Sequence, residues 1–274
     1  MESPNEFFPP SVISSRFFPS YNKFPAIGGF VRLPTVAVTF DDGYADNLEV
    51  ALPVLQRFDV PATVFVAPGF LDGGLMFNDA ITEIFRQAPA GLFDLQAFGL
   101  GSWQLDDWAG RRSAANKVTL QIKYQTLDER QSLIARLAQY AGASLPDSLM
   151  LSSEQLRQLN QSELIDIGAH TVNHPILARL DDVAAEAEIR ASKAQLEHLL
   201  GESVELFAYP NGKPGNDYLP QHVAQVQRAG FRYALSTSEG VARNRNALFE
   251  VPRLGSWDRT PMRFLARMCL LLAR

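Results

Sequence analysis

Residues 36–43 read VAVTFDDG, an apolar run that ends in two carboxylates and a glycine. Residues 164–175 read LIDIGAHTVNHP, a second apolar run that ends in two histidines separated by three residues. Each pattern is typical of a buried β-strand whose carboxyl end delivers ligand-type side chains into a loop. Two neutral imidazoles and one carboxylate give a divalent metal three protein ligands and leave positions for water and substrate. Together the two segments predict a catalytic metal site.

Short apolar runs alternate with helical patterns along much of the chain. Asn47–Phe58, Val183–Leu200 and Leu219–Ala229 have helical periodicity, with a kink or restart expected at Pro53. Strand–helix alternation with nearly continuous apolar strands indicates a parallel sheet covered by helices. Because the candidate ligands follow strand ends, we expect a barrel of the α/β class rather than an arbitrary sheet. The predicted strands are Thr35–Phe40, Ala62–Ala67, Leu164–Ala169, Glu205–Tyr209, Tyr233–Ser236 and Phe249–Leu254.

Two parts of the chain depart from this alternation. Residues 1–34 are rich in Phe, Pro and Ser and are expected to form an irregular lead-in. Residues 70–161 are expected to form a helical insertion between two barrel strands, because capping-box patterns at Thr126 and Ser152 each open a helix. We therefore expect residues 1–274 to form a single catalytic domain.

Composition and charge exclude several classes of function. The net charge of −5 and the lack of a basic cluster argue against a general nucleic-acid binder. Cys269 is the single cysteine, which excludes an internal disulfide framework. No secretory signal or membrane-spanning stretch is visible, so the chain as given is expected to be cytoplasmic. The basic, apolar segment 263–274 is interpreted as a last helix that docks on the protein, with a membrane-surface helix as the alternative.

A third apolar run leads into the turn-forming sequence YPNG at residues 209–212. Such a turn can aim a backbone N–H group at an oxyanion, a role that requires geometry rather than a particular side chain. If this turn is functional, Tyr209, Pro210 and Asn211 are candidates for contact with a substrate; the alternative is that the turn is simply a loop.

In this order, the three segments resemble the motifs of the polysaccharide deacetylases, the NodB-homology enzymes of carbohydrate esterase family four. The segments LPVL at 52–55, PATVFV at 61–66 and AGF at 229–231 support the resemblance. It implies a distorted (β/α) barrel with fewer than eight regular strands. It also implies a hydrolase that removes the N-acetyl group from a hexosamine of a polysaccharide or glycolipid intermediate.

The resemblance also assigns roles to the site residues. Asp42, His170 and His174 would bind one divalent metal ion, with zinc expected and cobalt, nickel or manganese as alternatives. Asp41 would be the general base for the attacking water, since its charge is not committed to the metal. The backbone N–H of Asn211 would help to bind the oxyanion.

The sequence departs from the family pattern in two places. The family's third motif usually begins with an arginine that orients the base, but this chain has Ala208 there. We expect Arg253, near the end of the last predicted strand, to replace it with a bidentate contact to the Asp41 carboxylate. The family's late Leu-x-Leu-x-His motif, which supplies a general acid, is not recognisable. The remaining histidines, His198 and His222, are predicted to lie on helix surfaces.

Three functions remain open from the sequence. The first is an N-deacetylase acting on a polysaccharide or a lipid-linked sugar. The second is a related amide hydrolase, such as a sugar deformylase or an imide hydrolase. The third is a non-catalytic glycan-binding protein on a decayed enzyme scaffold. The intact set of two aspartates and two histidines argues against the third function, whereas the missing general acid argues for it.

Overall fold

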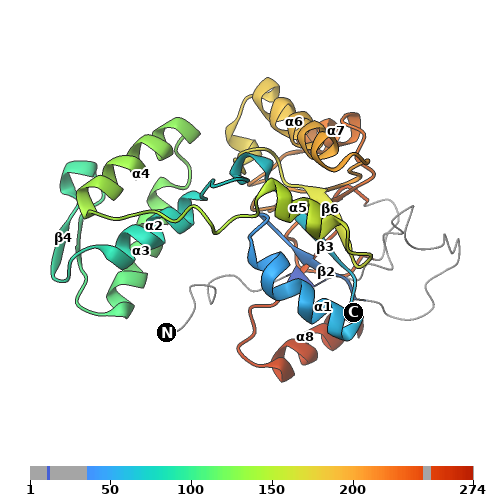
Figure 1. The fold of residues 1–274 in the computed structure, drawn as a ribbon, viewed down its shortest axis with the longest axis horizontal. Helices are drawn as coiled ribbons and strands as arrows, with labels where there is room; N and C mark the ends of the chain where they lie inside the picture. Colours follow the sequence, from blue (N-terminus) through green and yellow to red (C-terminus); the bar gives the residue numbers. More distant parts are fainter. Residues whose placement is uncertain (1–10, 13–35, 243–247, 274) are drawn as a thin grey trace, which may run out of the picture. The chain divides into compact units, whose positions relative to one another are not determined.

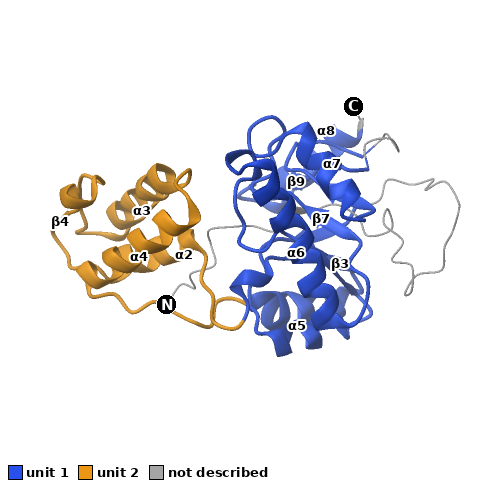
Figure 2. Cartoon of the chain, turned by 90° about the horizontal axis from the view of Figure 1, so that it is seen from above, with its two compact units in different colours: residues 1–71, 151–274 blue, residues 72–150 orange. Residues whose placement is uncertain are grey.

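The computed structural model describes residues 11–12, 36–242 and 248–273 (Figure 1). The chain divides into two compact units, which have different colours in Figure 2. Unit 1 comprises Met1–Leu71 and Leu151–Arg274, and unit 2 comprises Asp72–Met150. All the residues that the sequence predicts for the functional site lie in unit 1.

Unit 1 is built on a seven-stranded sheet with the strand order β8-β7-β6-β3-β2-β1-β9. In this sheet, β2, β3, β6, β7 and β8 run parallel, whereas β1 is antiparallel to both of its neighbours. The curled sheet and its helices form the distorted (β/α) barrel that the sequence predicts. The strands are β1 (Ser11–Val12), β2 (Val38–Phe40), β3 (Ala62–Val66), β6 (Ile165–Ala169), β7 (Leu206–Ala208), β8 (Tyr233–Leu235) and β9 (Leu254–Gly255).

A short closing segment, residues 248–255, is hydrogen-bonded to both edges of this sheet. At one edge, Ala234 N–H donates to Leu248 O and Val251 N–H donates to Ala234 O, each over 2.9 Å. At the other edge, β9 pairs with β1. The sequence predicts one strand over Phe249–Leu254, but the pairing changes partner around Pro252, which has no N–H to donate. The segment therefore links the two edges of the barrel.

The centre of the sheet explains the apolar runs in the sequence. Every residue of β3 is buried, as expected for a parallel strand covered on both faces. In β6, a Cβ atom on Gly168 would lie only 2.4 Å from a ring carbon of Phe65 on β3. Glycine at this position therefore lets the Phe65 ring pack against the neighbouring strand.

Helices cover the sheet of unit 1, and most of them begin or end where the sequence indicates. Pro53 lies in the first turn of α1 (Leu52–Phe58), directly after the π-helical turn η3 (Asn47–Ala51), so the predicted restart is confirmed. Helix α6 (Asp182–Leu200) ends at Gly201, whose φ of 73° suits a glycine C-cap. The other described helical elements of unit 1 are η4 (Pro68–Phe70), α5 (Ser153–Asn160), η6 (Leu177–Arg179), α7 (Pro220–Arg228) and α8 (Pro261–Ala273).

Unit 2 is mainly helical and has its own apolar core. The capping box predicted at Thr126 is present and opens α4. The predicted insertion also included the helix after Ser152, but that helix, α5, buries Leu156 and Leu159 in the core of unit 1. Unit 2 contains α2 (Phe77–Gln87), β4 (Leu92–Asp94), η5 (Gln96–Phe98), β5 (Ser102–Gln104), α3 (Trp108–Ile122) and α4 (Leu127–Ala141).

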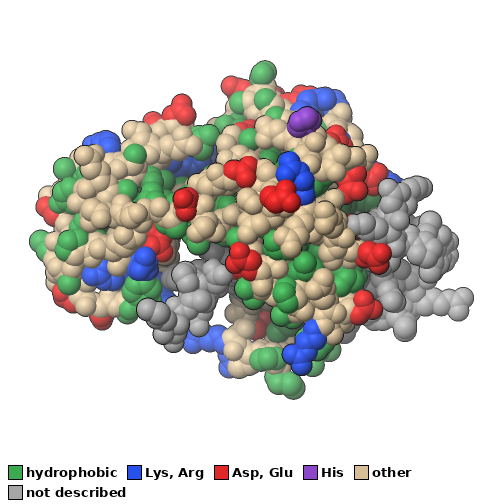
Figure 3. Space-filling model, viewed as in Figure 1, with side chains coloured by type: hydrophobic (Ala, Val, Ile, Leu, Met, Phe, Trp, Pro, Cys, Tyr) green, Lys and Arg blue, Asp and Glu red, His purple; other side chains and the backbone are tan. Residues whose placement is uncertain are grey.

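Helix α8 has apolar side chains on two faces. Phe264, Met268 and Leu271 are half-buried, in keeping with a docked helix, whereas Leu265 and Leu270 are exposed. None of the helices in the described ranges combines the length and the apolar character that crossing a bilayer requires. On the face drawn in Figure 3, basic side chains are interspersed with acidic ones rather than gathered into one patch.

Candidate metal centre

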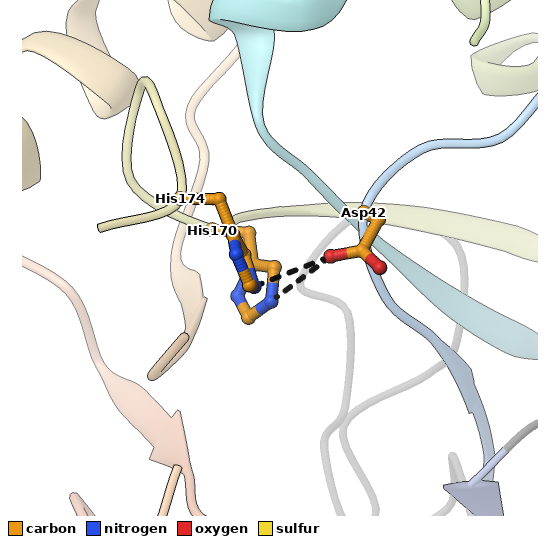
Figure 4. Close-up of side chains that lie close together, drawn as sticks. All are labelled: Asp42, His170 and His174. Carbon is orange, nitrogen blue, oxygen red and sulfur yellow. Dashed lines mark ion pairs between the residues drawn. The ribbon is translucent and has the colours of Figure 1, made fainter. Parts of the chain in front are cut away.

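Asp42, His170 and His174 converge where β2 and β6 end (Figure 4). Asp42 Oδ1 lies 3.5 Å from His170 Nε2 and 3.4 Å from His174 Nε2. One candidate ligand atom from each residue lies within 4.8 Å of the other two. The convergence of these side chains, predicted from segments far apart in the sequence, is therefore confirmed.

The separations suit a divalent metal ion. In a tetrahedral zinc site with bonds of ~2.0–2.1 Å, neighbouring ligand atoms are about 3.3 Å apart. Both oxygen–nitrogen separations are close to that value. Two imidazole nitrogens with one carboxylate oxygen form a donor set for zinc or a similar transition metal rather than for calcium or magnesium. The residues therefore fit the predicted metal.

The loops that carry the ligands contain unusual backbone conformations. Asp42 has a φ of 78° and His174 a φ of 50°, in the left-handed region that non-glycine residues seldom adopt. The Ala67 N–H donates to Asp42 O over 3.3 Å, which ties the ends of β2 and β3 together. Such conformations persist only where the surrounding structure holds them, and they are frequent at functional sites.

The surroundings of His170 favour the form that binds metal. Its Nδ1 lies 2.7 Å from Ala208 O, and since a carbonyl only accepts, Nδ1 carries the proton and Nε2 is left as a donor to metal. Burial lowers the pKa of His170 and outweighs the opposing effects of Asp41 and the Ala208 carbonyl. The imidazole is thus held neutral, as metal coordination requires.

Asp41 has different surroundings from Asp42. Arg253 Nη1 donates to Asp41 Oδ1 over 2.6 Å, so the contact predicted from the sequence is present. It uses one nitrogen rather than the expected fork, because Arg253 Nε donates to Ser236 O over 2.9 Å. Arg253 Nη1 is also 3.4 Å from Thr39 Oγ1. The Arg253 side chain is 2% exposed, whereas that of Asp41 is 26% exposed and can be reached by small molecules.

The charge of Asp41 follows from these contacts. Burial raises the pKa of the Asp41 carboxyl, but the charge of Arg253, followed by His170, the hydrogen bond from Arg253 and His174, together outweigh burial. The pKa therefore lies below its ordinary value. A carboxylate that is ionised near neutral pH and not among the metal ligands can accept a proton.

The turn after β7 places its residues in different ways. Tyr209 is fully buried, stacks on Tyr218 at 3.8 Å and donates its hydroxyl to Phe249 O, so its side chain belongs to the core. Burial raises the pKa of this hydroxyl. Pro210 is buried as well. Contact of these two residues with a substrate remains a prediction.

Asn211, the candidate oxyanion donor, lies in the turn after β7 with a left-handed backbone. It is half-buried with a φ of 59°, and its carbonyl accepts from Thr237 Oγ1 over 2.7 Å. Its backbone N–H donates to no acceptor within the described ranges of the chain. That N–H is therefore available to a ligand.

The two remaining histidines differ from each other. His198 is exposed on α6, as predicted. His222 is 1% exposed, and its Nδ1 accepts from Leu219 N–H over 3.0 Å at the start of α7. The prediction of a surface position is wrong for His222, because its ring caps a helix end. Neither residue joins the group of candidate metal ligands.

Sequence reasoning missed two residues that hold the site in place. Ser236, whose carbonyl holds Arg253, directly follows β8, so a search for residues at strand ends could have found it. Glu188 accepts hydrogen bonds from the loop that carries His174, but it lies inside α6, where no local pattern marks it.

The curled parallel sheet carries an Asp–His–His set and a second carboxylate at its strand ends, an arrangement suited to metal-assisted hydrolysis on a (β/α) barrel. A family model described as polysaccharide deacetylase matches residues 31–234. The chain belongs to the polysaccharide deacetylase family. The resemblance inferred from the motifs is thereby confirmed.

Individual relatives are distant. YxkH of Bacillus subtilis, which is named for the same family, is 19% identical over 219 residues, or 80% of this chain and 50% of YxkH. The chain thus spans about half the length of this relative. The Streptococcus pyogenes deacetylase PplD in complex with acetate has a TM-score of 0.51 at 19% identity, over 84% of this chain and 67% of PplD. A de-N-acetylase from Aggregatibacter actinomycetemcomitans has a TM-score of 0.50 at 15% identity, over 84% of this chain and 72% of that chain. These likenesses concern the fold.

Proposed function

We propose that this protein is a metal-dependent N-deacetylase that hydrolyses the N-acetyl group of a hexosamine in a polysaccharide or a lipid-linked sugar. The observation that carries the proposal is the pairing of two kinds of carboxylate at one strand end. Asp42 faces two imidazoles, whereas Asp41 is paired with a buried arginine. Metal-dependent amide hydrolysis uses a metal site and a separate base, and this geometry supports both.

Asp42, His170 and His174 would hold the metal, for which zinc is the first candidate. When bound, the metal polarises the amide carbonyl and makes a water molecule more acidic. The neutral form of His170 and the 3.4–3.5 Å spacing between ligand atoms support this assignment.

The chain's own residues would move the protons and hold the charge. Asp41 accepts a proton from the attacking water, and Arg253 keeps the Asp41 carboxylate ionised and oriented. The Asn211 N–H donates to the oxyanion that forms as the carbonyl is attacked. The leaving amine needs one proton, and protonated Asp41 can return the one it accepted. This order of proton transfers does not require the histidine that is missing from the family's late motif.

The test is hydrolysis by the purified, zinc-loaded protein of N-acetylglucosamine oligomers and of their N-formyl analogues. Released acetate and formate are measured separately, with Asp41→Asn as the control. Acetate release that Asp41→Asn abolishes supports the proposal. Release of formate alone would favour a deformylase, and zinc and glycan binding without turnover would favour a binding protein.

A further inference from the structure

Glu188 is in contact with the loop between the two histidines of the site. This residue of α6 lies outside all the motifs and is half-buried. Its Oε2 accepts from Val172 N–H over 2.8 Å and from Asn173 N–H over 2.9 Å. Its Oε1 accepts from Asn173 Nδ2 over 2.7 Å. One carboxylate therefore binds three donors from two successive loop residues.

The conformation of this loop explains why it needs such a partner. Thr171 has a φ of 59° and His174 a φ of 50°, so left-handed residues flank the pair of N–H donors. Two successive N–H groups directed at one point cannot both join a regular helix or sheet, and such pairs form concave anion-binding sites. A carboxylate satisfies them with charge-assisted hydrogen bonds, which are stronger than neutral ones.

The same loop is held by a second contact. Gly69 N–H donates to Val172 O over 2.9 Å. A Cβ on Gly69 would lie 2.6 Å from both Val172 O and Asn173 Oδ1, so only glycine allows this approach. The loop is thus fixed by η4 at one contact and by Glu188 at the other.

The two histidines depend on this loop to different degrees. His170 directly follows β6, and its ring is held by Ala208 O. His174 lies beyond the residues that Glu188 binds, so its Cα position follows from the conformation of residues 171–173. A shift of this short loop would move His174 while leaving His170 in place.

We propose that Glu188 is a positioning residue for the metal site: it holds the loop 171–174 in the conformation that presents His174 to the metal. This inference rests on the proposed function in one respect: it takes Asp42, His170 and His174 to be the metal ligands. Glu188 touches neither the metal nor the substrate and acts through the loop backbone.

The first test is zinc affinity of Glu188→Gln, measured by competition with a chromogenic chelator. The glutamine has the same shape but only one oxygen atom. In one orientation its NH₂ group faces Asn173 Nδ2, which is also a donor. In the other orientation the NH₂ group faces the backbone N–H groups of Val172 and Asn173, which then lose their acceptor. We expect zinc affinity to fall about 10–100-fold, the usual effect of losing a residue that supports a ligand. We also expect faster hydrogen exchange of the Val172 and Asn173 amides.

Glu186→Gln is the matched control, because Glu186 lies on the same helix but pairs with Arg190 and Arg228 at the surface.

A second variant separates loop positioning from general destabilisation. In Glu188→Gln with Asn173→Asp, the new carboxylate can accept from the glutamine NH₂, and the total charge is that of the original pair. We expect this double variant to regain most of the lost zinc affinity. If Glu188→Gln does not fold by circular dichroism, Asn173→Ala, which removes only the Oε1 contact, should show the same two effects at smaller size.

Three results would overturn the inference: unchanged zinc affinity in Glu188→Gln, equal loss in Glu186→Gln, or no recovery in the double variant. None of these measurements involves turnover. If zinc affinity behaves as expected but no acid is released from any substrate, the proposed function fails and the role of Glu188 stands.

Discussion

Asp41 and Asp42 are neighbours in the chain, but their side chains have different partners. Asp42 faces His170 and His174, and Asp41 contacts Arg253. The left-handed backbone at Asp42 turns the chain directly after β2, which lets adjacent carboxylates serve different partners. Substitutions of the two residues should therefore have different consequences.

We expect Asp41→Asn to reduce turnover by at least about 100-fold, the usual contribution of a general base, while zinc affinity stays nearly unchanged. Asp42→Asn and His174→Ala should lower both quantities. Isothermal titration with zinc and acetate release provide the two readouts. If Asp41→Asn loses zinc as severely as Asp42→Asn, the assignment of a base and a ligand is wrong.

Arg253 should influence the pH dependence of the reaction. The charge of Arg253 counteracts the effect of burial and lowers the pKa of Asp41, so Arg253→Ala removes that effect and the pKa rises. The base works only when ionised, so the acid limb of the pH–rate profile should move to higher pH. Arg253→Lys keeps the charge but loses the geometry that also reaches Ser236 O, and we expect an intermediate rate. An unshifted acid limb in Arg253→Ala would show that Arg253 does not act on the base.

At the scale of elements, the sequence predicted the strands, helix starts and helix caps that depend on local residue patterns. The parallel strands, the restart at Pro53 and the capping box at Thr126 follow from periodicity and cap chemistry, and the structure has them. The metal ligands were predictable because each follows an apolar strand. A feature that depends on distant contacts was not predictable: α5 belongs to unit 1 because Leu156 and Leu159 pack in its core. The position of His222 was missed although its contact with Leu219 N–H is local.

Gly168 provides a test of packing between strands. We expect Gly168→Ala to destabilise unit 1 by about 1–3 kcal/mol, since the new methyl group overlaps the Phe65 ring. Urea denaturation measures the loss. Phe65→Leu should cost stability by itself, but the double variant should lose less than the two single losses together, because the residues are in contact. Simple additivity would show that the Phe65 ring is not the cause.

At the scale of the whole molecule, the two units have separate apolar cores. Every residue of the main core of unit 1 comes from outside residues 72–150, and every residue of the core of unit 2 comes from within them. The three candidate ligands and Glu188 all belong to unit 1. Both ends of the insertion return to the core of unit 1, through Leu71 and Leu151.

We therefore expect replacement of residues 72–150 by a short Gly/Ser linker to leave unit 1 folded, with zinc affinity within a few-fold of the full chain. Circular dichroism and the chelator competition measure the outcome. Failure of the shortened chain to fold would instead support a single domain that needs its insertion.

The closing segment at residues 248–255 has a consequence for how the protein responds to heat. Arg253 belongs to the same segment that joins the two sheet edges, and its N–H donates to Ser238 O beside β8. Local fluctuations that detach this segment would withdraw the guanidinium from Asp41 while the central strands remain intact. At any moment, only molecules in which residues 248–255 are paired with the sheet would have Arg253 in contact with Asp41 and be able to catalyse the reaction. The rate of hydrolysis should therefore fall on warming at temperatures below the unfolding of the core, and it should recover on cooling.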